Sequence, residues 1–442
     1  MYELLIILSK YLFLFYIIFF LWQSLKMILT SHEIFNSNIN NCVFRQYLAL
    51  ILFHSTAFLI LSFNPESHAF EPNALLICFL GIVLFTVAHI MLRITYPNSS
   101  KLIWNSIFFI CDIGLVMLQR LNPELAQKQL IWLLAGFIIT FVMPFVLDFI
   151  KDLSKLKYLY LGVTILLLLM TFFFGNTEGG AKNWLTIKSI TFQPSEPIKL
   201  LFVLYLVAEL AKPKVSFVNL IIGTVISAFV ILVLVFQKDL GSALIFFVTY
   251  MVIMYITTSS NLVLVLGTVM ASIASFVAYN LFSHIRTRVA SWLNPWADIA
   301  DGGYQITQSL FALTTYGFWG SGLNRGMPSS IPVVERDFIF SAICEEFGVI
   351  FVICIILMFL TIFYSAIRVA LTSRNRYMSV LVSALTCLLC FQTFLIIGGV
   401  IKLIPMTGVT LPFISYGGTS MIMSFIIIGM IQRVSSLNAV NS

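Results

Sequence analysis

Long apolar stretches separated by short polar turns recur along the entire chain. About thirteen of them have roughly 17 to 25 residues, enough to cross a bilayer as a helix. They do not alternate between apolar and polar positions as barrel strands do, and in lipid a helix satisfies its own backbone hydrogen bonds. The pattern therefore predicts an all-α polytopic membrane protein with spans near 5–25, 47–64, 73–92, 104–119, 129–149, 158–175, 197–211, 217–236, 240–257, 261–281, 346–367, 379–400 and 412–432.

Composition supports this class. The chain has 442 residues, of which 60% are hydrophobic and 10% charged, and this excludes a soluble globule. The formal net charge of +7 comes largely from lysines and arginines in alternate loops, which suits anionic lipid rather than nucleic acid. Cytoplasmic loops carry an excess of these residues, so we expect the N-terminus outside and the C-terminus in the cytoplasm. The five histidines show no metal-ligand spacing, and the C-x-x-C formed by Cys387 and Cys390 lies inside an apolar span, where a packing role is the favoured interpretation.

A polar break at 94–103 divides the spans into two groups. Three spans precede it and ten follow it. We therefore predict a three-helix membrane extension over residues 1–100 and a ten-helix core over residues 101–442. The core contains one long polar loop, 282–337, which the charge argument places outside the membrane.

Two short segments of the core carry unusual polar residues. In the first, Lys182 and Trp184 precede a helix whose first turn holds Glu196 and Lys199. Residues three apart share a helix face, so Glu196 and Lys199 can pair, either structurally or as part of a site. In the second, Asp239 lies between two spans, where capping a helix is the favoured interpretation.

The long loop concentrates charge in a way that spanning lipid does not require. Arg286 and Arg288 leave the tenth span, and Asp298 and Asp301 follow within NPWADIAD. Residues 304–316 are typical of a helix lying in the membrane interface.

The end of this loop also carries charge. Arg336 precedes Asp337, and Asp337, Ser341 and Glu345 have the spacing of one helix face, with Glu346 adjacent.

A final segment, 404–420, contains prolines and glycines at membrane depth, directly after Lys402. Irregular backbone is tolerated there only where it packs on protein or lines a cavity. A kinked helix is the simpler interpretation, and a ligand-lining segment is favoured by the polar residues.

These segments, in this order, closely resemble the SEDS family (shape, elongation, division and sporulation), the RodA/FtsW/SpoVE-type peptidoglycan polymerases. The resemblance covers roughly 104–435 and rests on blocks such as GAKNW, KDLG, NPW.D, GYQ, DFIF and LPF.SYGG. It departs from the common family pattern at Lys182-Asn183, at QKDLG and at Glu335-Arg336. It implies a ten-helix core that polymerises lipid II, an undecaprenyl-diphosphate-linked disaccharide-peptide, in the bacterial cytoplasmic membrane. A class B penicillin-binding protein is the implied partner.

The family's essential acid lies ahead of the GYQ run, and this position is Asp298. The resemblance makes Asp298 the general base of an inverting transfer, with undecaprenyl diphosphate as the leaving group. Residues that could bind the substrate, mostly by meeting the diphosphate, are Arg286, Arg288, Lys182, Trp184, Lys199, Arg336 and Lys402. Carboxylates expected to organise these cations are Glu196, Asp239, Asp337, Glu345 and Glu346.

No cofactor is certain, although a divalent cation such as Mg²⁺ or Mn²⁺ could share the leaving-group charge. The main alternative function is a lipid-precursor flippase or transporter, for which Asp112 and Glu209 are the intramembrane charges to follow. A non-catalytic scaffold for cell-wall enzymes is the third reading.

Overall fold

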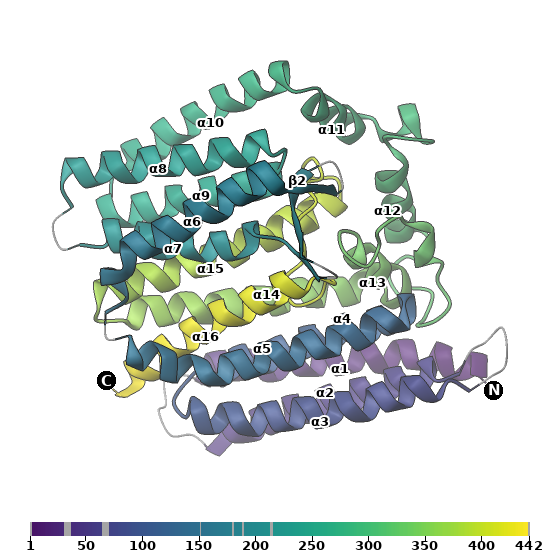
Figure 1. The fold of residues 1–442 in the computed structure, drawn as a ribbon. Helices are drawn as coiled ribbons and strands as arrows, with labels where there is room; N and C mark the ends of the chain where they lie inside the picture. Colours follow the sequence, from purple (N-terminus) through teal and green to yellow (C-terminus); the bar gives the residue numbers. More distant parts are fainter. Residues whose placement is uncertain are drawn as a thin grey trace.

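The computed structural model describes residues 2–30, 37–63, 70–150, 152–178, 181–187, 190–212 and 215–440. Its long helices run side by side, with the C-terminus at one end and the long polar loop at the other (Figure 1). Twelve helices in this part of the chain are long and apolar enough to cross a membrane. They are α1 (Tyr2–Thr30), α2 (Ser37–Leu61), α3 (Pro72–Thr95), α4 (Lys101–Leu121), α5 (Pro123–Phe149), α6 (Lys157–Phe174), α8 (Phe217–Phe236), α9 (Leu240–Thr258), α10 (Asn261–Leu281), α14 (Val349–Thr372), α15 (Arg376–Val400) and α16 (Gly418–Val440).

The remaining predicted span is α7 (Ser195–Leu210), a helix of 16 residues. It is shorter than a bilayer-crossing helix, and nearly all of its residues are buried among neighbouring helices. Protein rather than lipid surrounds α7, which explains how Lys199 can lie within it. The prediction of an all-α membrane protein is confirmed.

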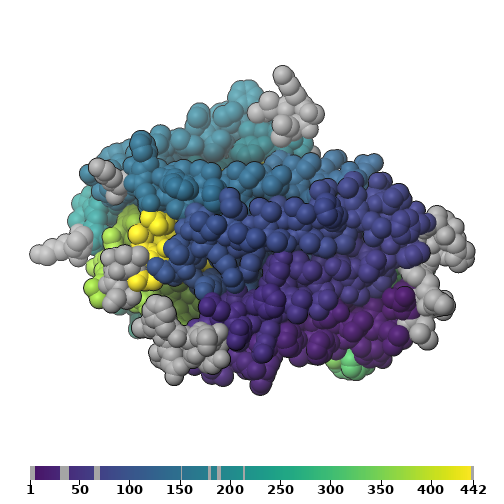
Figure 2. Space-filling view, turned by 90° about the horizontal axis from the view of Figure 1, so that it is seen from below, coloured from purple at the N-terminus to yellow at the C-terminus, as the bar shows by residue number. Residues whose placement is uncertain are grey.

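Helices α1 to α3 cover one side of the molecule (Figure 2). Together with α5 and α14 they enclose α4, whose membrane-spanning window is completely buried. Phenylalanine rings fill the interface: Phe109 of α4 lies 4.9 Å from Phe20 of α1 and 5.1 Å from Phe53 of α2, centroid to centroid. The side chains of His54 on α2 and Asp112 on α4 also form a buried ion pair there.

The long polar loop folds into short helices. In order these are α11 (Ser283–Leu293), the 3-10 turn η2 (Pro295–Asp298), α12 (Tyr304–Thr314) and the 3-10 turn η3 (Pro328–Ser330), followed by α13 (Ile339–Phe347). A helix is therefore present where one was expected at 304–316, as α12. The expected shared face of Asp337, Ser341 and Glu345 is wrong, because α13 begins at Ile339 and leaves Asp337 outside the helix.

Two hairpins between α6 and α7 were not predicted. Strands β1 (Asn176–Glu178), β2 (Ala181–Ile187) and β3 (Ile190–Phe192) pair antiparallel in that order, after the 3-10 turn η1 (Leu153–Leu156) and α6. Successive side chains of β2 point to opposite faces. Ala181, Asn183 and Trp184 of this strand line the cavity described below.

Residues 401–417 connect α15 to α16 without regular structure. Gly408 and Phe413 have φ of +70° and +67°. The freed backbone finds partners nearby: the Gln392 side-chain amide donates to the Thr410 carbonyl at 2.9 Å, and the Tyr416 N–H donates to the Glu335 carbonyl at 2.9 Å. The segment thus packs on protein, as irregular backbone at membrane depth requires.

Candidate active site

A cavity of about 840 Å³ opens at the end of the bundle that carries the polar loop. Its walls come from the starts of α5, α7, α9, α12 and α16, from β2 and β3, and from α11. The segment before α13 and the irregular segment after α15 complete them. Ligand pockets are typically about 300–1,000 Å³, so this cavity is large enough for part of a sizeable substrate. Its charged lining residues are Lys128, Glu196, Lys238, Asp239, Arg288, Arg336 and Asp337.

Arg288 supplies a half-buried cation to this cavity from α11. Its Nη1 has no hydrogen-bond partner. Burial lowers the pKa of Arg288, while the carboxylates of Asp239 and Asp337 oppose that shift, so the guanidinium stays charged. Arg286 lies two residues earlier, on a different face of the same helix, where it is exposed and outside the cavity lining.

Arg336 and Trp184 meet in the lining of the same cavity. The Arg336 guanidinium carbon lies 5.5 Å from the centre of the Trp184 ring, a cation–π contact. Asp337 is next in the chain, largely surrounded by protein but partly open to the cavity. Burial raises the pKa of Asp337 to about 6, against the lowering influence of Arg336 and Arg288.

Asp298 lies at the rim. It ends η2 and is exposed, and its Oδ2 accepts the Gly302 N–H at 3.1 Å. Gly302 and Ser291 both line the cavity, and the position of a Cβ on Gly302 would be 3.3 Å from Asp298 Oδ2 and 3.2 Å from Ser291 Oγ. The turn needs glycine at the next position too, because a side chain on Gly303 would collide with the Pro295 carbonyl. The loop therefore holds one carboxylate beside the cavity with an oxygen still available.

Two predicted residues near β2 have structural partners. Asp239 caps α9: its carboxylate accepts the Ser242 N–H at 3.0 Å and the Asn183 amide at 2.7 Å. Lys182 is adjacent to Asn183 on the strand and so points the other way. Its Nζ donates to the Phe172 carbonyl at 2.9 Å, outside the cavity lining.

The predicted pair in α7 is present. Lys199 Nζ lies 2.8 Å from Glu196 Oε1 and 2.9 Å from the Gln392 side-chain oxygen, and all three residues are buried. Only Glu196 reaches the cavity. Lys199 thus acts on the site through its neighbours, holding α7 against α15.

Three further predicted residues lie away from the cavity. Lys402 is beside the end of α11, where its carbonyl accepts the Trp292 indole N–H at 3.1 Å. Glu345 accepts the Met327 N–H at 2.7 Å, and Glu346 pairs with Arg120 of α4 at 3.0 Å. These two carboxylates stabilise the loop that precedes α13, and both lie outside the lining of the cavity.

Sequence reasoning missed two cations of the cavity, Lys128 on α5 and Lys238 in the turn before α9. Lys238 was visible as part of QKDLG, but nothing in the sequence showed that the turn faces the long loop. Lys128 follows an ordinary helix start and gives no local signal. Within the described residues, no group of three or more His, Cys, Asp or Glu side chains is arranged to hold a metal ion.

A helical bundle embedded in the membrane, with cations and carboxylates gathered around a cavity at one end, has the features of an integral membrane enzyme for an anionic substrate. The sequence model of the FtsW/RodA/SpoVE family, described as cell cycle protein, matches residues 101–439. The chain belongs to this family, the SEDS proteins.

Known proteins agree with this assignment. Peptidoglycan glycosyltransferase RodA of Mycobacterium tuberculosis is 31% identical over 387 residues, covering 80% of this chain and 81% of that protein. The fold is similar to a chain from the structure "Structural coordination of polymerization and crosslinking by a peptidoglycan synthase complex", with a TM-score of 0.67, 24% identity, and coverage of 77% of this chain and 98% of that one. It is also similar to the rod shape determining protein RodA of Thermus thermophilus, with a TM-score of 0.55, 24% identity, and coverage of 77% and 97%.

Proposed function

We propose that this protein is a peptidoglycan glycosyltransferase that polymerises lipid II at the outer face of the bacterial cytoplasmic membrane. Family membership supports the class of reaction. The single observation that carries the assignment to this site is Arg288, a desolvated cation with an unpaired N–H in a cavity that Asp298 borders. Such a cation is suited to a diphosphate. We place the catalytic work in residues 101–442 and regard residues 1–100 as an addition to that core.

The reaction joins two lipid-linked sugars. Asp298 takes the proton of the acceptor 4-hydroxyl, whose oxygen attacks the anomeric carbon of the donor. The bond from that carbon to the diphosphate oxygen breaks with inversion, and undecaprenyl diphosphate leaves. A sugar hydroxyl is a weak nucleophile at neutral pH, and general-base assistance is typically worth about 10² to 10⁴-fold.

The leaving diphosphate gains negative charge as the bond breaks. Arg288 and Arg336 both line the cavity, and Lys128 and Lys238 add two more cations. Preorganised cations in a water-poor site stabilise such charge without reorganising during the reaction. The positive charges of Arg288 and Arg336 both act on the Asp337 carboxylate, which orients the two arginines.

The cavity end of the bundle then faces outward, with the N-terminus outside and the C-terminus in the cytoplasm. The expected partner is a class B penicillin-binding protein that crosslinks the new strands. A structural relative belongs to a complex described as coordinating polymerisation and crosslinking, which supports this pairing.

A flippase is less well supported, because it needs charged groups along a path through the membrane. The two intramembrane acids are instead committed to partners outside the cavity. Asp112 pairs with His54, and Glu209 lies 2.8 Å from Lys157 and 3.2 Å from Lys212.

The deciding experiment is glycan-strand formation from purified lipid II by the full chain in detergent, where transport has no meaning. We expect Asp298→Asn to abolish polymerisation while the protein stays folded. The matched control is Asp301→Asn, which changes an exposed carboxylate in the same loop and should leave activity nearly intact. Full activity of the Asp298 variant would overturn the catalytic assignment, and a scaffold role would then be favoured.

A further inference from the structure

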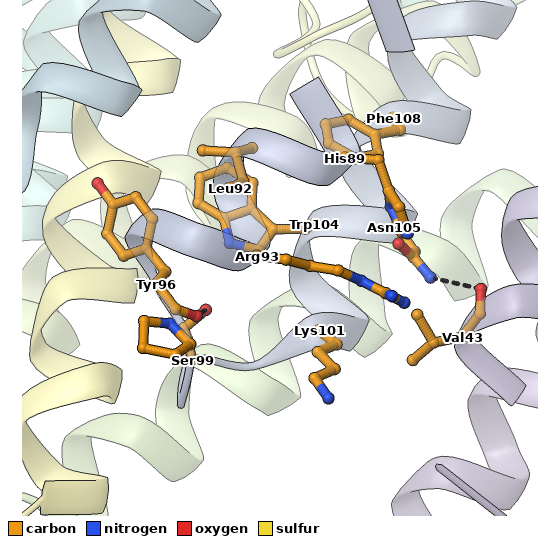
Figure 3. A pocket seen from close by; sticks show the side chains of 11 residues that line it. Val43, His89, Leu92, Arg93, Tyr96, Ser99, Lys101, Trp104, Asn105 and Phe108 are labelled. Atoms are coloured by element: carbon orange, nitrogen blue, oxygen red, sulfur yellow. Dashed lines mark hydrogen bonds between the residues drawn. The ribbon is translucent and has the colours of Figure 1, made fainter. Parts of the chain in front are cut away.

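We propose that a second pocket, between α2, α3 and α4, binds the phosphate-bearing headgroup of an anionic phospholipid. It lies where the N-terminal extension meets the core, and the reaction proposed above does not use it. The pocket has a volume of about 140 Å³, well above the roughly 10–15 Å³ that one water needs. Figure 3 shows its lining, with Arg93 extending toward Val43 and Asn105.

The pocket gathers positive charge without a carboxylate. Arg93 ends α3 and Lys101 begins α4, and both line the pocket. Within the described residues, Arg93 makes no hydrogen bond or ion pair, and Lys101 Nζ donates only to the neutral Asn40 oxygen at 3.0 Å. None of the residues that line the pocket is acidic. A guanidinium and an ammonium group close together, against partly apolar walls, are stabilised by a bound anion.

A buried donor in the same wall also lacks a partner. Trp104 is 5% exposed, and its indole N–H is shielded from solvent and donates to no acceptor in the protein. A buried N–H without a partner destabilises the folded protein unless a ligand or water supplies the acceptor. The first-turn N–H groups of α4 likewise donate no hydrogen bond to the Ser100 side chain. Cations, an unpaired indole N–H and a positive helix end all suit a phosphate oxygen.

The position of the pocket favours a lipid over a soluble phosphate compound. Helix α4 runs from Lys101 at the pocket to Arg120, which contacts the outer loop through Glu346. Twenty-one helical residues span about 30 Å, so the pocket lies at the membrane surface opposite the main cavity. Exposed apolar side chains of Ile90 and Ile94 flank Arg93 on α3 and offer a surface for acyl chains. Basic pockets between membrane helices are known to hold anionic headgroups in this way.

Binding is tested on the purified full chain by native mass spectrometry and by thermal stabilisation with added lipid. We expect dioleoylphosphatidylglycerol to bind and stabilise the protein, and dioleoylphosphatidylcholine to do so far less. Arg93→Gln combined with Lys101→Gln should weaken phosphatidylglycerol binding about tenfold or more, because two charge-assisted contacts are lost. Trp104→Phe, which keeps the ring but removes the N–H, should weaken binding by a smaller factor.

Arg45→Gln is the matched control, because Arg45 is an exposed cation of α2 outside the pocket lining. It should bind phosphatidylglycerol like the unmodified protein. Equal losses in the Arg45 variant and the double variant would mean general surface attraction and would overturn the proposal. So would unchanged binding in both the double variant and the Trp104 variant. Inorganic phosphate and glycerol 3-phosphate form a separate arm, and stabilisation by either as strong as by the lipid would contradict the lipid assignment. Polymerase activity is not the readout, so failure here leaves the proposed function untouched.

Discussion

Replacing Arg288 by glutamine tests the charge arrangement of the cavity most directly. The substitution removes the positive charge and keeps a side chain that can hydrogen-bond. Nη1 of Arg288 is already shielded from water and unpaired in the folded protein, so substrate binding does not have to desolvate it. Losing one preorganised donor to a developing negative charge typically costs about 10² to 10³ in kcat, or about 2.7–4 kcal/mol. Because Arg336 and two lysines share the cavity, we expect the lower end, about a 10²-fold loss.

The assay is the initial rate of glycan-strand formation by the purified full chain over a range of lipid II concentrations. Arg286→Gln is the control, since Arg286 is two residues away on the same helix but exposed and outside the cavity lining. We expect it to stay within about twofold of the unmodified protein, in line with ordinary surface substitutions. Thermal unfolding of both variants checks that the bundle is intact.

The reasoning fails if Arg288→Gln keeps more than a third of the activity while folding normally. It also fails if Arg286→Gln loses as much as Arg288→Gln, because the loss would then reflect the loop's overall charge and not one residue in the cavity.

Three other predictions concern separate carboxylates. Asp298→Asn should lose about 10² to 10⁴-fold in kcat with an unchanged unfolding temperature, while Asp301→Asn stays active; the polymerisation assay measures both. Because the pKa of Asp337 is about 6, its carboxylate ionises as the pH rises through 6, so kcat/KM should be about tenfold lower at pH 5 than at pH 7. Asp337→Asn should have a low kcat/KM that no longer changes between pH 5 and pH 7. If kcat/KM of this variant still fell at pH 5, Asp337 would be excluded as the source of the pH dependence. Asp112→Ala leaves His54 without its partner and should lower the free energy of unfolding by about 3–5 kcal/mol, whereas replacing both residues by apolar side chains should recover most of that loss. Unfolding curves in detergent measure both variants. Equal losses in the single and the double variant would mean that the ion pair is irrelevant to stability.

The spans were predictable because length and hydrophobicity alone specify a helix in lipid. The pairing of Glu196 with Lys199 was also predictable, since it depends only on spacing within one helix. The direction in which a side chain points was harder to predict. Lys182 lies on an unrecognised strand and points away from its neighbour Asn183, and Asp337 precedes the helix to which it was assigned.

The cavity itself depends on which turns meet in space. Lys128 and Lys238 are separated by more than a hundred positions in the chain, and neither has a local pattern that marks it as functional. Only the folding of the chain brings them to the lining of one cavity. Sequence reasoning therefore named five of the seven charged residues that line the cavity, whereas separating them from the predicted residues outside it required the fold.

Because α4 is completely enclosed, the protein should not tolerate removal of the helices that precede it. Removing the first hundred residues would strip the ring of Phe109 of its aromatic neighbours and leave the Asp112 carboxylate facing hydrocarbon with no counter-charge. It would also release the backbone carbonyl of Gly320, which Lys10 Nζ contacts at 2.8 Å, and so loosen the stretch that leads to α13. A trimmed ten-helix version should accordingly insert poorly, and an added tag is better carried at the opposite terminus.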